Sequence, residues 1–113
     1  MPSRLFDVQQ LSPTFVAVNT AVIADNLVVA APVASLRIVV LGFSLVSTGA
    51  NTVTWLSNAV GISGPVDLGA LGVWGVGTGI APVLACTAGQ ALNLRLSAAT
   101  KVAGFVVYAL DVV

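Results

Sequence analysis

The sequence has little charge and lacks two residue types, histidine and glutamate. Of its 113 residues only 7% are charged, four basic and four acidic, with a net charge of zero. Ordinary globular chains carry about 25% charged residues. The absence of histidine removes the commonest general base and metal ligand. So few cations cannot neutralise a run of phosphates, so we expect no nucleic-acid partner.

Residues that could carry chemistry are few and scattered. The single cysteine, Cys86, cannot form an internal disulfide, and without a histidine base it is expected to be a small buried apolar residue. The four aspartates share no metal-ligand spacing. Residues 75–79 alternate glycine with other residues but lack the Gly-Lys-Ser/Thr ending of a phosphate-binding loop. We therefore expect no catalytic residue, no metal and no cofactor, and a protein that is not an enzyme.

Hydrophobic residues are abundant, at 58%, and the mean hydropathy is +1.05. Residues 38–66 and 68–94 are long enough to cross a bilayer without meeting a charge except at Asp67 between them. Serine, threonine and asparagine interrupt the first stretch, and glycine and proline the second. The N-terminus also lacks a signal-peptide pattern. We expect no membrane partner, with a membrane-inserted protein as a minor alternative.

The residue choice is typical of β-structure, because valine dominates and β-branched side chains suit a pleated surface. Leu92, Leu94 and Leu96 alternate with polar residues, a period of two that predicts a strand over 90–97. Further strands are expected at the following ranges: 14–19, 21–30 with breaks near 25–26, 35–47, 51–57, 61–68 with an edge or bend at Pro65, 80–87 and 101–112.

Turns and loops complete this outline. Residues 49–51 are predicted to turn a hairpin between strands 35–47 and 51–57. Residues 69–79 are expected to form a glycine-rich loop that carries Trp74. Residues 1–13 are the most polar part and indicate an N-terminal arm. The sequence thus predicts an all-β protein, a two-sheet antiparallel β-sandwich over residues 14–113 preceded by that arm.

Two predicted strands, 36–47 and 101–112, are apolar on both faces, whereas a sandwich buries only one face of each sheet. In the last strand Val106 and Tyr108 are assigned to the core, so Phe105 and Val107 point outward. Loops or the arm could cover the second faces, but contact between subunits is the favoured interpretation. We therefore predict an oligomer with an interface that contains five residues: Phe105, Val107, Phe43, Leu45 and Trp74.

Several segments resemble small virion proteins of tailed bacteriophages, which are jelly-roll-like β-sandwiches. They are residues 37–46, 52–55, 62–65 with Leu68, and 89–99 followed by Val102, Gly104 and Tyr108. The resemblance implies a homotrimeric capsid decoration (cement) protein located on the virion and assembled in the host cytoplasm. Its partner is then the major capsid protein, whose subunits it clamps to stabilise the head.

The polar arm is expected to contact the capsid through Arg4, Phe6 and Asp7. The alternative within the same family is a tail fibre or spike domain that binds a host surface glycan through an exposed aromatic side chain such as Trp74.

Overall fold

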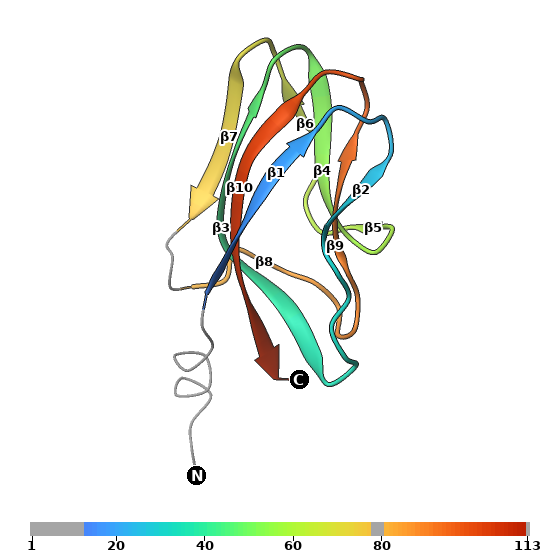
Figure 1. Ribbon diagram of the computed structural model, residues 1–113, viewed down its shortest axis with the longest axis vertical. Helices are drawn as coiled ribbons and strands as arrows, with labels where there is room; N and C mark the ends of the chain where they lie inside the picture. Colours follow the sequence, from blue (N-terminus) through green and yellow to red (C-terminus); the bar gives the residue numbers. More distant parts are fainter. Residues whose placement is uncertain (1–12, 78–80, 113) are drawn as a thin grey trace.

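A computed structural model describes residues 13–77 and 81–112, which form ten strands in two antiparallel sheets (Figure 1). Sheet A has the strand order β1 (Thr14–Thr20), β10 (Val102–Val112), β3 (Leu36–Ser47) and β7 (Gly72–Gly77), and β8 (Leu84–Ala85) also pairs with β3. Sheet B has the order β2 (Asp25–Val29), β9 (Leu92–Leu96), β4 (Asn51–Ser57) and β5 (Val60–Gly61), and β6 (Val66–Leu68) also pairs with β4.

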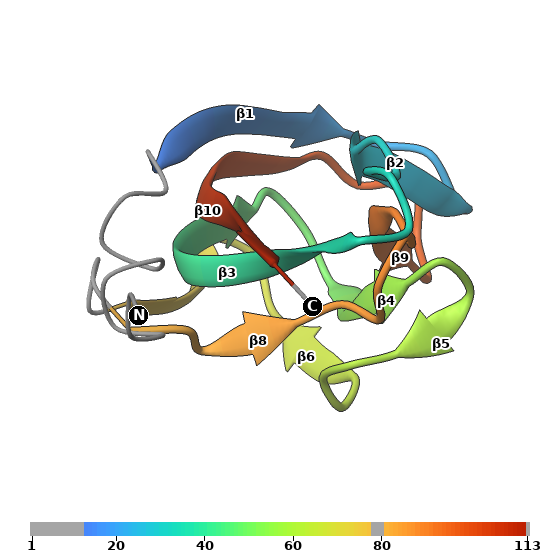
Figure 2. The same cartoon turned by 90° about the horizontal axis from the view of Figure 1, so that it is seen from below.

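Consecutive long strands alternate between the two sheets, which is the connectivity of a jelly roll. Viewed along the long axis, sheet A lies on one side and sheet B on the other, with the interior between them (Figure 2). The prediction of an all-β, two-sheet antiparallel sandwich is confirmed. None of the described residues belongs to a helix that could cross a membrane.

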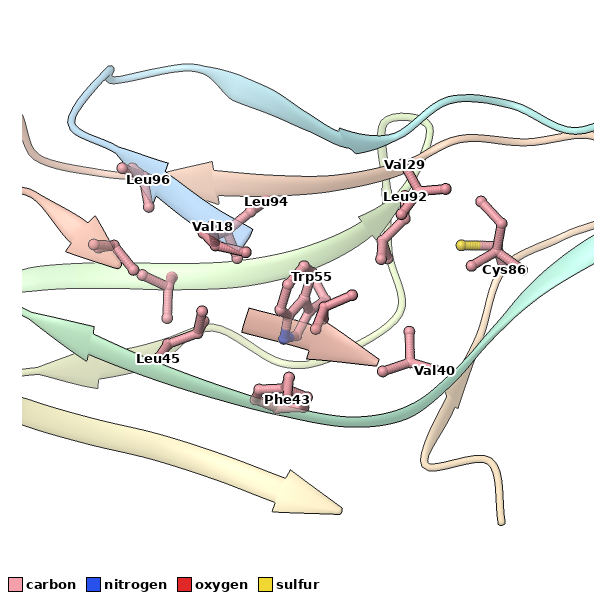
Figure 3. Close-up of a cluster of buried hydrophobic side chains, with 14 of the residues drawn as sticks. Val18, Val29, Val40, Phe43, Leu45, Trp55, Cys86, Leu92, Leu94 and Leu96 are labelled. Atoms are coloured by element: carbon pink, nitrogen blue, oxygen red, sulfur yellow. The ribbon is translucent and has the colours of Figure 1, made fainter. Parts of the chain in front are cut away.

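The core is built from the inward faces of both sheets (Figure 3). Leu92 and Leu94 of β9 and Val53 and Trp55 of β4 are fully buried, as the alternation in both strands predicts. Trp55 packs edge-on against Phe43 of sheet A, with ring centroids 5.3 Å apart. Since every second residue of a strand faces the same way, the polar residues between these positions lie on the outside of sheet B.

A β-bulge in β3 changes which of its residues face the core. Val107 of β10 pairs with Gly42, but the next residue, Tyr108, pairs with Val40, so Leu41 is an extra residue in β3. One extra residue reverses the side-chain alternation beyond it. Phe43 and Leu45 therefore lie in the core, 4% and 0% exposed. The expectation that these two residues face outward, at an interface, is wrong.

Two further expectations are wrong. Residues 49–51 do turn the chain, but they carry it from sheet A to sheet B, so β3 and β4 are not a hairpin. β4 pairs instead with β9, and the Asn51 side chain donates to the Ala98 and Thr100 carbonyls in the segment that follows β9. Residues 72–77, expected in a loop, form β7, because six backbone pairs with β3 outweigh the weak strand propensity of glycine.

Candidate assembly surface

The outward face of sheet A carries two rows of residues that run across its four main strands. The first row follows the strand register as Phe15, Val107, Gly42 and Gly77, from β1 through β10 and β3 to β7. The second row, two residues further along each strand, consists of Ala17, Phe105, Ser44 and Gly75. Within these two rows the large side chains, Phe15, Val107 and Phe105, lie on β1 and β10, and the positions on β3 and β7 are glycine or serine.

This arrangement makes a shallow groove of about 520 Å³, lined by both rows except Ala17 and by Phe43 and Val76. Phe15 and Phe105 form its wall, with ring centroids 6.0 Å apart, and they are 71% and 42% exposed. None of the residues that line the groove is charged. Val46 and Val73, also exposed, extend the apolar surface along β3 and β7. Exposed apolar surface of this kind marks an interaction site.

The floor of the groove requires glycine at two paired positions. A Cβ atom added at Gly77 lies 2.8 Å from the Cα atom of Gly42, and one added at Gly42 lies 3.0 Å from the Cα atom of Gly77. Backbone on the opposite strand cannot move away as the end of a side chain can. The floor is therefore backbone without side chains, buried at Gly42 and exposed at Gly77.

At one end of the groove the same face of sheet A holds a small buried cluster of Val39, Leu41 and Ala109, against which Val107 packs. Beyond it, the Arg37 guanidinium donates hydrogen bonds from Nε and Nη2 to Oδ2 of Asp111, at 3.2 and 2.9 Å. Phe105 and Val107 thus point away from the core, as predicted, while Val106 is buried and Tyr108 packs against the core. Their role in an interface between subunits stays a prediction.

Trp74 lies on the other side of sheet A. It is half-buried on β7 and packs edge-on against Phe43, with ring centroids 4.9 Å apart. Because it pairs with the inward-facing Leu45, its ring covers the rim of the core and not the outer groove. The placement of Trp74 in an exposed loop is wrong for the same reason that β7 was missed. Arg4, Phe6 and Asp7 lie outside the described residues.

Sequence reasoning missed Phe15 and the three glycines of the groove. The alternation of Phe15 and Ala17 with Val16 and Val18 could have placed Phe15 on an outer face, since Val18 is buried. The glycines could not be found that way. Their meaning depends on the register that sets Gly42 beside Gly77 and Ser44 beside Gly75, which links residues over thirty positions apart.

A smaller hollow, of about 330 Å³, lies on sheet B beside Thr52, Asp67 and Ser97. It is polar, and its side chains are engaged with one another: the Thr52 hydroxyl donates to Oδ1 of Asp67 at 2.6 Å. Asn51 Oδ1 accepts the backbone N–H groups of Ser97 and Ala98 at 3.0 and 3.1 Å. These bonds tie β4 to the segment that leads into β10. The hollow has no aromatic lining residue.

The side chains of the described residues that the sequence singled out for chemistry are buried, engaged in structure or far from one another. In ranges 13–77 and 81–112 no three His, Cys, Asp or Glu side chains come together as metal ligands would. Cys86 is buried, and its burial raises the pKa of the thiol, which disfavours the nucleophilic thiolate. The Ser63 hydroxyl accepts the backbone N–H of Trp55 and donates to the Gly64 carbonyl, so it holds a turn.

Comparisons with known proteins identify a shared fold. No family model matches the chain, and no curated protein sequence matches it. A solved structure of Bacillus endospore appendages, described as a novel family of disulfide-linked pili, is similar with a TM-score of 0.55 and 12% sequence identity. The similarity covers 91% of this chain and 88% of that one. The chain therefore shares the two-sheet fold of an appendage protein, and this match does not identify a bacteriophage family.

Proposed function

We propose that this protein is a non-enzymatic structural subunit that assembles with copies of itself into a larger surface structure. The observation that carries the proposal is the outward face of sheet A, where Phe15 and Phe105 are exposed above an uncharged glycine floor. A protein that works alone gains nothing from two exposed phenylalanines on one face. Contact with another subunit removes them from water, which is the main driving force of association.

The fold shared with an appendage protein supports a role in an extracellular or surface structure. The link between subunits differs, however. Those appendages are described as disulfide-linked, whereas this sequence has one cysteine, and Cys86 is 3% exposed in the core. Assembly of this protein therefore depends on non-covalent apolar contacts. Near-zero charge suits such contacts, because permanent interfaces are the more apolar ones.

The strand motifs that resemble phage virion proteins give this proposal a narrower form. In that form the protein is a trimeric capsid decoration protein that contacts the major capsid protein, and its place is the virion. Attachment through Arg4, Phe6 and Asp7 of the arm belongs to the same proposal. The number of copies on purified particles tests it: hundreds per particle support decoration, and a handful argue for a tail or fibre part.

Glycan binding is less well supported by the arrangement of side chains. A sugar site combines an aromatic ring with hydrogen-bonding groups that fix the sugar hydroxyls. Here the exposed rings, Phe15 and Phe105, lie on sheet A, and the polar hollow around Asp67 lies on sheet B. The two features do not meet in one site.

The proposal is tested by the mass of the full-length protein in solution. Size-exclusion chromatography with light scattering should show a defined oligomer at micromolar concentration, and electron microscopy should show regular assemblies at higher concentration. A protein that stays monomeric over the whole range, with folded strands confirmed by circular dichroism, contradicts the proposal.

A further inference from the structure

We infer that the outward face of sheet A binds the same face of a second copy of this chain, about a two-fold axis that runs along the strands between β10 and β3. This inference rests on the proposed function in its general form, self-assembly, and not on the trimeric form, and it names the surface and symmetry of one subunit contact. It commits to a second copy as the occupant of the groove, in preference to the arm or an unrelated partner.

The order of residues across the strands carries the inference. Consider a two-fold axis that runs parallel to the strands, midway between the facing sheets of two copies. Each row of one copy then faces the same row of the other copy with its residues in the opposite order. The first row, Phe15–Val107–Gly42–Gly77, then meets its own reverse. Phe15 of one copy lies opposite Gly77 of the other, and Val107 lies opposite Gly42. Each large side chain of the row therefore faces a glycine.

The second row matches in the same way. This row meets the same row of the other copy in reverse order, so Phe105 lies opposite Ser44, and Ala17 lies opposite Gly75. Facing sheets pack about 10 Å apart, so a phenylalanine that meets glycine or serine fills the gap without collision. An axis across the strands within these two rows instead keeps β10 opposite β10, so Phe105 lies opposite Phe105 or Val107 of the other copy, and both are large. The pattern of large and small residues thus selects one of the two possible axes.

Charge and area both permit this contact. The groove lining is uncharged and the chain has no net charge, so two copies approach without repulsion. Four strands at spacings of about 4.8 Å, over the seven residues of β1 at about 3.4 Å each, give a face of roughly 19 by 24 Å. Two such faces bury about 900 Å² in projection, close to the roughly 1,000 Å² expected of a biological interface.

The experiment exchanges the large and small partners of the second row in the full-length chain. Ser44→Phe fills the hollow that receives Phe105 of the other copy, and Phe105→Ser removes the side chain that fills it. Each single variant should raise the dissociation constant of the dimer at least about 30-fold, the size of effect seen at interface hot spots. The double variant S44F/F105S again sets a phenylalanine of one copy opposite a serine of the other, so it should recover most of the lost affinity. Leu27→Ser, on the exposed outer side of β2, is the matched control and should change nothing.

If the face associates only through non-specific apolar contact, Ser44→Phe should have the opposite effect and strengthen association, because it adds apolar surface. If Ser44→Phe impairs folding, as judged by thermal melting, Phe15→Ser replaces it, since Phe15 is 71% exposed at a sheet edge. Phe15→Ser should likewise weaken the dimer.

A wild-type protein that assembles while every one of these variants assembles equally well overturns the inference and leaves the proposed function intact. A trimer by light scattering that needs Phe105 also overturns it, since a two-fold contact yields dimers. So does loss of the contact on deletion of residues 1–12 alone, which makes the arm the occupant. A wild-type monomer overturns the proposed function itself.

Discussion

The outward faces of the two sheets differ in almost every respect, although both belong to the same small sandwich. On sheet B, Asp25, Arg95 and Thr54 lie side by side in register, and Arg95 donates to Asp25 at 2.7 and 3.1 Å. On sheet A, the corresponding central strands present Phe105, Val107, Ser44 and Gly42. The face of sheet B satisfies its polar groups at a solvent surface, whereas the face of sheet A, apart from the Arg37–Asp111 pair near one end, exposes apolar groups.

Under the proposed function, this difference separates what folding requires of a sheet from what assembly would require. Alternation of leucine with Asn93 and Arg95 on β9 is all that an isolated sandwich requires. Sheet A exceeds that requirement, since its second face is apolar at the cost of solubility. A monomer gains little stability from Phe15, whose side chain is 71% exposed. The proposed contact with a second subunit would account for its presence on this face.

The largest expected effect separates the two faces of sheet A. Val106→Asp places a charge at a position with 0% exposure in the core and should abolish cooperative folding, because a buried unpaired charge is very costly. Phe105→Asp, one residue away, should leave the unfolding free energy within about 1 kcal/mol of wild type and dissociate the oligomer. Urea titrations followed by tryptophan fluorescence, with light scattering, test both. Equal damage to folding by the two variants contradicts the assignment of faces.

The next effect concerns how sheet B uses its polar groups. Asn51→Ala removes the acceptor of the Ser97 and Ala98 N–H groups and the donor to the Ala98 and Thr100 carbonyls. Since unsatisfied buried groups cost about 1–3 kcal/mol each, the variant should lose about 2–4 kcal/mol of unfolding free energy in urea. Asn93→Ala, which loses one exposed bond to the Asn58 carbonyl, is the control and should lose less than about 1 kcal/mol. Comparable losses of unfolding free energy from the two variants would show that the bonds of Asn51 stabilise the fold no more than one exposed hydrogen bond does.

A smaller effect compares the ion pairs of the two outer faces. Asp111 is 4% exposed and Arg37 42%, whereas Asp25 and Arg95 are 34% and 48% exposed. Arg37→Leu should lower the unfolding free energy by about 1–2 kcal/mol, because it removes charge-assisted bonds to a buried carboxylate. Arg95→Leu should lower the melting temperature only slightly, because water largely replaces the lost partner. A greater loss from Arg95→Leu contradicts this ranking.

The smallest effect is a dependence on pH. The hydrogen bond from Arg95 holds the pKa of Asp25 below its ordinary value of 3.8. The folded state therefore binds a proton less readily than the unfolded chain, so the stabilisation is complete above that value and is lost as pH falls through the lower folded pKa. Wild type should thus lose its small advantage over Asp25→Asn between about pH 5 and pH 2, as followed by thermal melting. A gap that widens as the pH falls contradicts the assignment.

Much of the fold could be predicted because its strands carry local patterns. The alternation in β9 and in residues 52–55 of β4 placed Leu94 and Trp55 in the core, and the run to Val112 gave the whole of β10. The faces of β3 could not be predicted. Leu36–Ser47 is apolar at nearly every position, so no alternation of polar and apolar residues shows which side chains face the core. No sequence pattern marks Leu41 as the extra residue of a β-bulge.

What the sequence by itself determined is the class of protein. β-branched residues, low charge and alternation dictate an all-β sandwich, and apolar residues on both faces of two strands already indicate surface left for a partner. Which residues form that surface was decided only by the tertiary structure. The bulge at Leu41 turned Phe43 and Leu45 inward, and the pairing of β3 with β7 brought Gly42 beside Gly77 and opened the groove next to Phe15. Register across strands distant in the sequence depends on the packing of the whole sandwich, because local propensity is the same for either register.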